Sequence, residues 1–304
     1  MAQQAIKFKV TKETGKREPF NILTIIMLVV LIVYVVSLFI PCFWSIYTSL
    51  KDVRVFRKDP ISLPTDPKFE NYVTIFKNLY IPIQQNGVTV KVQMGNLFLN
   101  ALIYSLSCAL TSSFVPLLVA YLCARFPYKF SKVVHTTVIV VMILPIVGAL
   151  PSEILMAKSF GLFDQLWGLA IMRGHFLGMY FLIYYGMFKS LPMAYTEAAK
   201  IDGAGNLNIF IRIILPLVKN TFFTVMLIHF IGFWNDYNTP LIYMPSFPTI
   251  AYSMYYLTHF TLNELSYTPM RMALAMFLFI PVFIVFLIFH KRLLGNLTVG
   301  GLKG

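Results

Sequence analysis

The chain alternates between long apolar runs and shorter polar segments. Six runs contain no Asp, Glu, Lys or Arg near their middle, and in chain order they cover 20–44, 97–122, 133–155, 169–188, 217–237 and 272–289. A helix needs about 20 mostly apolar residues to cross a bilayer. The pattern therefore predicts an all-α, polytopic membrane protein with six transmembrane helices. Pro116, Pro145 and Pro281 lie inside these runs, where we expect kinks and not breaks, because membrane helices tolerate proline.

The polar segments define the domain organisation. An N-terminal tail (1–19) precedes the first transmembrane helix (20–44), and an outer loop (45–96) separates that helix from a transmembrane core. The core (97–290) contains a polar segment at 191–216 and is followed by a C-terminal tail (291–304). A loop as long as 45–96 usually has a function, and within it the residues 72–80 predict a short amphipathic helix.

Composition and charge support a membrane protein with a fixed orientation. The chain is 58% hydrophobic and 12% charged, whereas a soluble domain has roughly twice that charged fraction. Its net charge of +13 has a topological explanation, because Lys and Arg collect in cytoplasmic loops. Outside the loop 45–96, the outer segments hold only Lys158, Arg173 and Arg271 if both termini are cytoplasmic. We therefore predict cytoplasmic termini, and no nucleic-acid partner is needed to explain the charge.

The sequence contains no motif for catalysis or for a bound cofactor. Cys42, Cys108 and Cys123 do not have a metal-like spacing, and neither a G-x-x-x-x-G-K-[ST] phosphate loop nor a hydrolase motif is present. His229 is the one titratable candidate within the fifth run, and a hydrogen-bonded packing role is its simpler interpretation. We expect no enzyme activity and no cofactor on this chain, so that energy for uphill transport must come from another subunit.

The segment 191–216, named the coupling loop below, predicts a helix, a turn and a second helix. Pro192 and Glu197 suit the first turns of a helix. The following residues fall on one face of that helix by their spacing: Tyr195, Ala198, Ala199 and Asp202. Gly203 and Gly205 then end the helix, and 208–214 restarts a short apolar helix before the fifth run. The pattern fits a docking element for a partner and, equally, an amphipathic hairpin at the membrane surface.

A resemblance to a known family separates these two interpretations. Glu197-Ala198-Ala199, Asp202-Gly203-Ala204 and Ile214-x-Pro216 resemble the EAA loop of the permease subunits of bacterial ABC importers. The resemblance covers about 95–304 and includes Asn100-Ala101 and Trp234-Asn235-Asp236. The ending 295–304 is similar to that of the carbohydrate branch, the MalG-like permeases. Gly205-Asn206 departs from the family pattern, which has Ser and a basic residue after the turn.

The resemblance implies a function, a location and partners. The chain would be a permease of an ATP-driven, binding-protein-dependent importer in the bacterial inner membrane, with a carbohydrate as solute. The implied partners are a second permease in a heterodimer, two ATPase subunits that bind ATP-Mg, an external solute-binding protein and membrane lipid. The implied coupling residues are Glu197, Ala198, Ala199, Asp202 and Gly203. Among them, Glu197 would pair with a basic group of the ATPase. The alternatives are a permease for a non-sugar solute such as a peptide, and an ATP-independent channel or intramembrane enzyme.

A substrate path is predicted at the end of the fifth run. Trp234 and Tyr237 carry aromatic rings that could stack on a sugar, and Asn235 and Asp236 carry groups that could bind its hydroxyls. The alternative is that these aromatic residues belong to the belt of Trp and Tyr found at every membrane interface.

Overall fold

The computed structural model describes residues 21–297 except 86, 127, 145–146 and 261–262, with side-chain environments as far as residue 289. The predicted N-terminal tail, Pro145 and the end of the predicted C-terminal tail lie outside the described residues. The chain divides into two compact units, one ending at Ser45 and the other beginning at Ile46.

The first unit consists of most of helix α1 (Ile22–Ser49). The side chains of 22–43 are all exposed, and they are predominantly Ile, Leu and Val. A helix that is apolar on every side belongs in a membrane or in a protein core, and its 28 residues are enough to cross a bilayer. The predicted helix at 20–44 is confirmed, and it continues a turn further, to Ser49.

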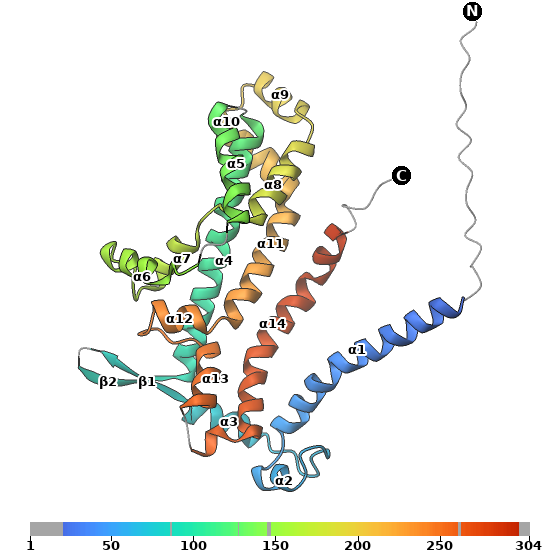
Figure 1. Cartoon of the computed structure of the whole chain (residues 1–304), viewed down its shortest axis with the longest axis vertical. Helices are drawn as coiled ribbons and strands as arrows, with labels where there is room; N and C mark the ends of the chain where they lie inside the picture. The colour runs from blue at the N-terminus through green and yellow to red at the C-terminus, as the bar shows by residue number, and fades with distance from the viewer. Residues whose placement is uncertain (1–20, 86, 127, 145–146, 261–262, 298–304) are drawn as a thin grey trace, which may run out of the picture. The chain divides into compact units, whose positions relative to one another are not determined.

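The second unit begins with the outer loop and then contains most of the helices (Figure 1). Its elements as far as the coupling loop are α2 (Val53–Lys58), α3 (Glu70–Asn78), β1 (Tyr80–Gln85), β2 (Val88–Gln93), α4 (Met94–Arg125), α5 (Lys129–Ile143), α6 (Leu150–Ser159), α7 (Leu166–Arg173), α8 (Met179–Ser190) and α9 (Ala194–Ile201). The remaining elements are α10 (Asn206–Ile209), a π-helical segment (Phe210–Ile214), α11 (Leu215–Asn235), α12 (Asn238–Tyr243), α13 (Ile250–His259), a 3₁₀ turn (Glu264–Ser266) and α14 (Thr268–Leu297).

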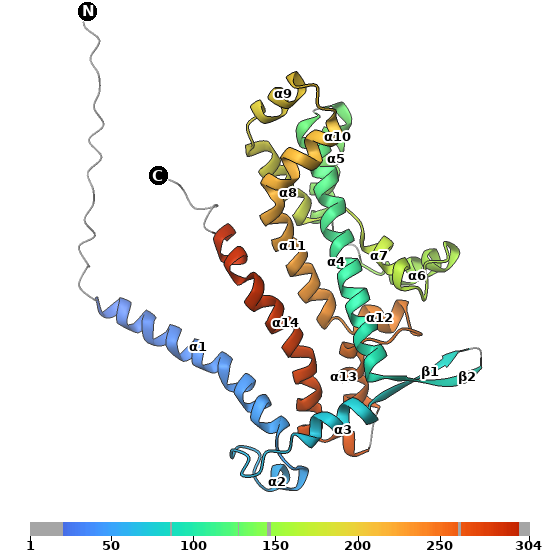
Figure 2. The ribbon, with the colours of Figure 1, turned by 180° about the vertical axis from the view of Figure 1, so that it is seen from behind.

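Helix α4 lies at the centre of this unit and packs against α7, α8 and α11. Figures 1 and 2 both show α4, α8 and α11 side by side. Small side chains make this packing close, because they let helix backbones approach one another. The buried small residues of α4 are Ala101, Ser105, Cys108, Ala109, Ser112, Ser113, Ala120, Cys123 and Ala124. Pro116 lies inside this helix without ending it, as predicted.

Four helical segments among the described residues are long and apolar enough to cross a membrane: Ile22–Ser49, Met94–Arg125, Asn206–Asn235 and Thr268–Phe289. The continuous helices predicted over 133–155 and 169–188 are wrong. Helix α5 ends at Ile143 because the residue before a proline is disfavoured in a helix, and Leu144 is extended. The fourth run is divided between α7 and α8, and the residues 174–178 between them are not helical.

The outer loop is folded and corrects the all-α prediction. The predicted helix at 72–80 is present as α3, but β1 and β2 form an antiparallel hairpin that pairs Tyr80 with Gln93 and Gln85 with Val88. Gly87 in its turn has φ +79°, a conformation that favours glycine. Asn-Gly between alternating apolar residues is a strong hairpin signal, so the sequence contained the information.

A buried asparagine joins the outer loop to the end of α1. The Nδ2 atom of Asn71 donates to the carbonyl oxygens of Ser49 at 2.8 Å and Lys51 at 2.9 Å. The Lys51 ammonium group is itself buried and donates to the carbonyl of Asp59 at 3.0 Å. Since the last carbonyls of a helix have no partner within it, Asn71 completes the hydrogen bonding at this helix end.

Replacing Asn71 with Leu should lower the thermal unfolding temperature of the detergent-purified protein. The change keeps a similar volume but leaves two buried carbonyls unpaired, at a cost of about 2 kcal/mol in the free energy of unfolding. Asn78→Leu is the matched control, because Asn78 is an exposed residue of the same helix. Equal unfolding temperatures for the two variants would contradict the anchoring role of Asn71.

Candidate coupling loop and solute path

The coupling loop forms the predicted helix and glycine turn. Helix α9 ends at Ile201, and Gly203 has φ +81°. The N–H of Gly203 donates to the Lys200 carbonyl at 3.0 Å, and that of Ala204 donates to the Ala199 carbonyl at 2.9 Å. These two bonds are the Schellman arrangement, in which a left-handed glycine closes the helix end. The prediction that Gly203 ends this helix and allows a tight turn is confirmed.

The predicted coupling residues divide between two faces of α9. Glu197, Ala198, Asp202 and Gly203 are exposed, whereas Ala199 is buried. The Glu197 and Asp202 carboxylates have no hydrogen bond or ion pair within the described residues. Of the four residues that the helical spacing places together, Tyr195, Ala198 and Asp202 are exposed, and Ala199 belongs to the buried cluster against which Ala204 packs.

Arg125, the last residue of α4, holds the start of the coupling loop. It is buried, its Nη2 donates to the carbonyl of Leu191 at 3.1 Å, and its Nη1 contacts the sulfur of Met193. A charged hydrogen bond is stronger than a neutral one, so α4 and the coupling loop are firmly connected here. The sequence identified Arg125 only as a cytoplasmic charge.

The sequence predicted a short helix at 208–214 that leads into the fifth run. In the structure the two are not separate helices. Residues Asn206–Asn235 form one continuous helical segment, with a π-helical stretch in which the N–H of Leu215 donates to the Phe210 carbonyl. Pro216 follows directly. A proline inside a helix lacks one donor and clashes with the carbonyl four residues earlier, and the wider π turn relieves this clash. Helices α10 and α11 thus belong to one continuous segment, whose hydrogen bonding changes at the π-helical stretch between them.

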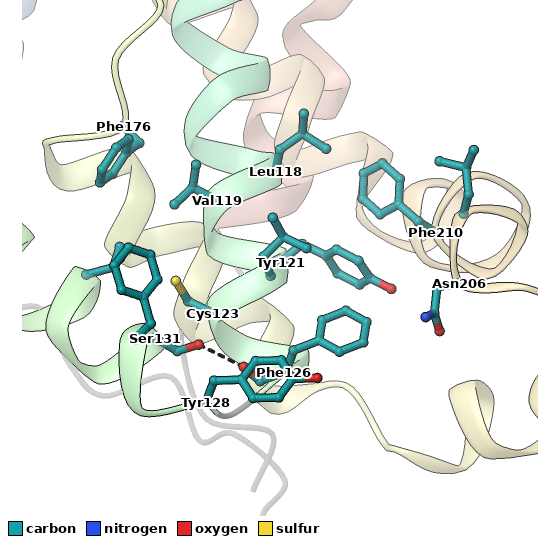
Figure 3. A pocket seen from close by; sticks show the side chains of 14 residues that line it. Leu118, Val119, Tyr121, Cys123, Phe126, Tyr128, Ser131, Phe176, Asn206 and Phe210 are labelled. Carbon is teal, nitrogen blue, oxygen red and sulfur yellow. Dashed lines mark hydrogen bonds between the residues drawn. The ribbon is translucent and has the colours of Figure 1, made fainter.

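An apolar cavity of about 810 Å³ lies beside α10. Figure 3 shows its walls: α4 contributes Leu118, Tyr121 and Cys123, and Asn206 and Phe210 come from the opposite side. The α5 wall is fixed by the hydroxyl of Ser131, which donates to the carbonyl of Phe126 at 2.8 Å. Between α10 and α5 the described residues therefore leave an open apolar space.

A smaller, polar cavity of about 190 Å³ lies at the gap between α7 and α8. Its polar wall residues are Ser112, Arg173, His175, Tyr180 and His229. Non-helical backbone at membrane depth is tolerated where it is buried in protein or lines a cavity. Here the free carbonyl of Arg173 accepts a hydrogen bond from the Ser112 hydroxyl at 3.0 Å.

His229 and Ser113 connect this polar cavity to α4. The Nδ1 atom of His229 and the Ser113 hydroxyl share a hydrogen bond of 2.9 Å, and the Tyr180 ring lies 4.5 Å from the imidazole. His229 thus has the hydrogen-bonded partner expected from its packing interpretation, but it also lines the cavity. The sequence gave no role to His175 or Tyr180, because their proximity to His229 depends on the break between α7 and α8.

Arg173 extends the polar network to α12 and α6. Its Nη2 donates to the Thr239 hydroxyl at 3.3 Å, and its guanidinium lies 6.0 Å from the ring centre of Tyr243. The Tyr243 hydroxyl donates to Glu153 at 2.7 Å. Burial and then this carboxylate raise the pKa of Tyr243 to about 12, so the phenol stays protonated as a donor.

The four predicted path residues lie together at the end of α11, in different environments. Trp234 is 1% exposed, and its indole donates to the Leu278 carbonyl at 3.0 Å. Asn235 is exposed and donates to the carbonyl of Ile231 in its own helix at 2.8 Å. Asp236 accepts from Tyr104 at 3.0 Å, and the ring of Tyr237 stacks on Tyr255 at 4.8 Å. The Trp234 ring is therefore packed inside the protein.

Comparisons with known proteins give the family. The family model described as "Binding-protein-dependent transport system inner membrane component" matches residues 116–297. The diacetylchitobiose uptake system permease protein NgcG of Streptomyces coelicolor is 26% identical, over 89% of this chain and 86% of that protein. The galactooligosaccharides transport system permease protein GanQ of Bacillus subtilis is 27% identical, over 94% and 95%. The maltodextrin transport system permease protein MdxG of Bacillus subtilis is 30% identical, over 69% and 76%.

A solved structure shares the fold. A chain of a bacterial ABC transporter involved in the import of the acidic polysaccharide alginate superposes with a TM-score of 0.73 at 22% identity, over 90% of this chain and 96% of that one. The family match itself extends over more than half of the sequence. The chain therefore belongs to the family of binding-protein-dependent transport system inner membrane components, which are multi-pass permease subunits of ABC importers and not enzymes.

Proposed function

We propose that this permease moves a carbohydrate into the cell and that the coupling loop transmits the work of a separate ATPase. The observation that carries the proposal is the exposed helix α9 with its Gly203 turn, joined through α10 to the helix that lines the polar cavity. A docking element and a polar passage on one continuous helix are what such a subunit requires.

The named relatives and the polar cavity both favour a sugar over a peptide. Curated relatives are named for diacetylchitobiose, galactooligosaccharides and maltodextrin. The polar cavity offers a hydroxyl at Ser112, imidazoles at His175 and His229, and the aromatic ring of Tyr180. Hydroxyl and imidazole groups can both donate and accept hydrogen bonds, as sugar hydroxyls do. Further out, Asn235 and Tyr237 remain candidates for the path, and Trp234 and Asp236 support them from within the protein.

The proposed topology has six spans with both termini in the cytoplasm. The spans are α1, α4, α5, α8, α11 and α14. Helices α5 and α8 are too short to cross alone, so α6, α7 and the adjoining non-helical residues complete their passages. In this orientation the inner side holds Arg125 and the coupling loop, and the outer side holds the loop 45–96.

The proposed partners follow from the family and from the exposed groups of α9. A second, non-identical permease completes the passage, two ATPase subunits bind ATP-Mg, and an external protein delivers the solute. Glu197 and Asp202 present carboxylates that have no partner within the described chain, and a basic group on the ATPase would complement them. Ala198 allows a close approach because its side chain is a single methyl group.

The transport activity is tested with the complete importer in proteoliposomes. ATP should drive uptake of a galactooligosaccharide or a maltodextrin, and a dipeptide should neither enter nor compete. Vesicles with the permease pair alone should show no uptake. ATP-driven entry of the dipeptide would refute the sugar assignment, and sugar entry without the ATPase would indicate a channel.

Gly203→Val should uncouple ATP hydrolysis from uptake while the protein still inserts into the membrane. A side chain at Gly203 meets no atom within 4 Å, but φ +81° is strained for a β-branched residue, so the effect acts through the turn. We expect uptake to fall at least tenfold. Gly205→Val is the matched control, because Gly205 has φ −68° and is equally open. Normal uptake by the Gly203→Val variant would show that the Gly203 turn is not needed for coupling.

Glu197→Lys should weaken the complex with the ATPase. Reversing a charge that meets a basic partner costs several kcal/mol at an interface, so we expect at least tenfold less ATPase to copurify. Glu70→Lys is the control, since Glu70 is an exposed carboxylate of the outer loop. An unchanged yield with Glu197→Lys would argue against docking at α9.

A further inference from the structure

The polar cavity is lined by one permanently charged residue, Arg173, and by no carboxylate. Arg173, His175 and His229 are among its walls, and the residues that line it include no Asp or Glu. The sign of this lining selects among solutes, because a cavity of one charge attracts groups of the other. The charge of the lining therefore indicates a narrower class of solute than carbohydrates in general.

The positive charge of Arg173 is not neutralised within the described residues. Its Nε is buried without a hydrogen-bond partner, and its other contacts are the Thr239 hydroxyl and the Tyr243 ring. A guanidinium group has five N–H donors in a planar fork and stays charged. Because the Nε atom is buried, the donors that remain for a ligand are those of Nη1 and the second N–H of Nη2.

Two acidic side chains that bond to the neighbours of Arg173 have other partners. Glu153 accepts the hydrogen bond of Tyr243. Asp236 accepts from Tyr104 through Oδ2 and, through Oδ1, from the N–H groups of Asn238 at 2.9 Å and Thr239 at 3.1 Å. Neither carboxylate forms an ion pair with Arg173 in the described structure. A charged side chain inside a membrane protein is costly and marks a functional site, and the missing counter-charge is available from a solute.

We propose that the polar cavity is an acidic-sugar subsite, in which Arg173 binds the carboxylate of a uronic acid unit. This proposal rests on the sugar transport proposed above. The planar fork of an arginine matches the two oxygens of a carboxylate. Ser112, His175 and His229 surround the same space and bind ring hydroxyls, and Tyr180 offers a ring face. At about 190 Å³ the cavity suits one sugar ring at a time, so a longer solute passes through it unit by unit.

The subsite is tested by binding to the purified complex of both permeases and the ATPase, without the binding protein. Ligand-detected NMR titrations compare D-galacturonate with D-galactose, which differ only in a carboxylate against a hydroxymethyl group. Galacturonate should bind at least tenfold more tightly to the wild type. Arg173→Gln should abolish this preference, and Arg173→Lys should keep part of it. Arg271→Gln is the matched control, because Arg271 also has a buried Nε without a partner but does not line the cavity.

Several outcomes would overturn the proposal. Equal binding of the two sugars to the wild type, or a preference that survives Arg173→Gln, removes Arg173 from recognition. An equal loss of both sugars in Arg173→Gln indicates a purely structural role. If neither sugar binds, the polar cavity is not a sugar site. In each case, ATP-driven uptake of a neutral oligosaccharide by the complete importer would leave the proposed function standing.

Discussion

The close packing of α4 against its neighbours is the interaction on which the rest of the structure depends. Small side chains along α4 allow α7, α8 and α11 to approach it, and each functional region is attached to a different level of this helix. Asn100 and Tyr104 bond to the outer segment at Pro248 and Asp236. Ser112 and Ser113 bond to the walls of the polar cavity, and Arg125 bonds to the coupling loop. One rigid element thus fixes the spacing between all three regions.

The demand for satisfied backbone groups explains why the polar cavity lies where it does. A break in a helix at membrane depth exposes carbonyl and N–H groups that lipid cannot bind. The break between α7 and α8 needs polar neighbours, and the Ser112 hydroxyl supplies one of them at the carbonyl of Arg173. In the function proposed above, the same polar neighbours bind the solute. In a protein whose spans are otherwise apolar, a helix break needs side chains that hydrogen-bond to its backbone. Such a break therefore brings polar groups into the interior, where a hydrophilic passage would need them.

The sequence predicted the helices and helix ends that depend on local pattern. It missed the features that depend on tertiary packing. The helices α1, α4 and α14 were found because length and apolar character define them, and the end of α9 was found because Gly203 alone suits its backbone angle. The break at 174–178 has no local mark beyond two glycines, and the helix prediction therefore ran through it. Arg173 looked like an outer-loop charge, because only the packing of α7 on α4 brings it to the cavity. The burial of Ala199 likewise depends on tertiary packing that spacing on a helix does not reveal.

For the proposed coupling, a movement of the coupling loop has to reach the polar cavity. This requires a stiff helix between the two and one point at which that helix can bend. The continuous helix 206–235 is stiff over most of its length, since its hydrogen bonds are made within the segment. It yields most readily at the π-helical stretch before Pro216, where the hydrogen bonding is already irregular. The apolar cavity lies on the α5 side of Phe210, whereas Arg125 holds the opposite end of the loop on α4. Under the coupling proposed above, a push on α9 would move α11 relative to α4, and the bond between His229 and Ser113 joins these two helices. The two sides of the polar cavity belong to the two elements that would shift, which is the differential contact that a change between two states needs.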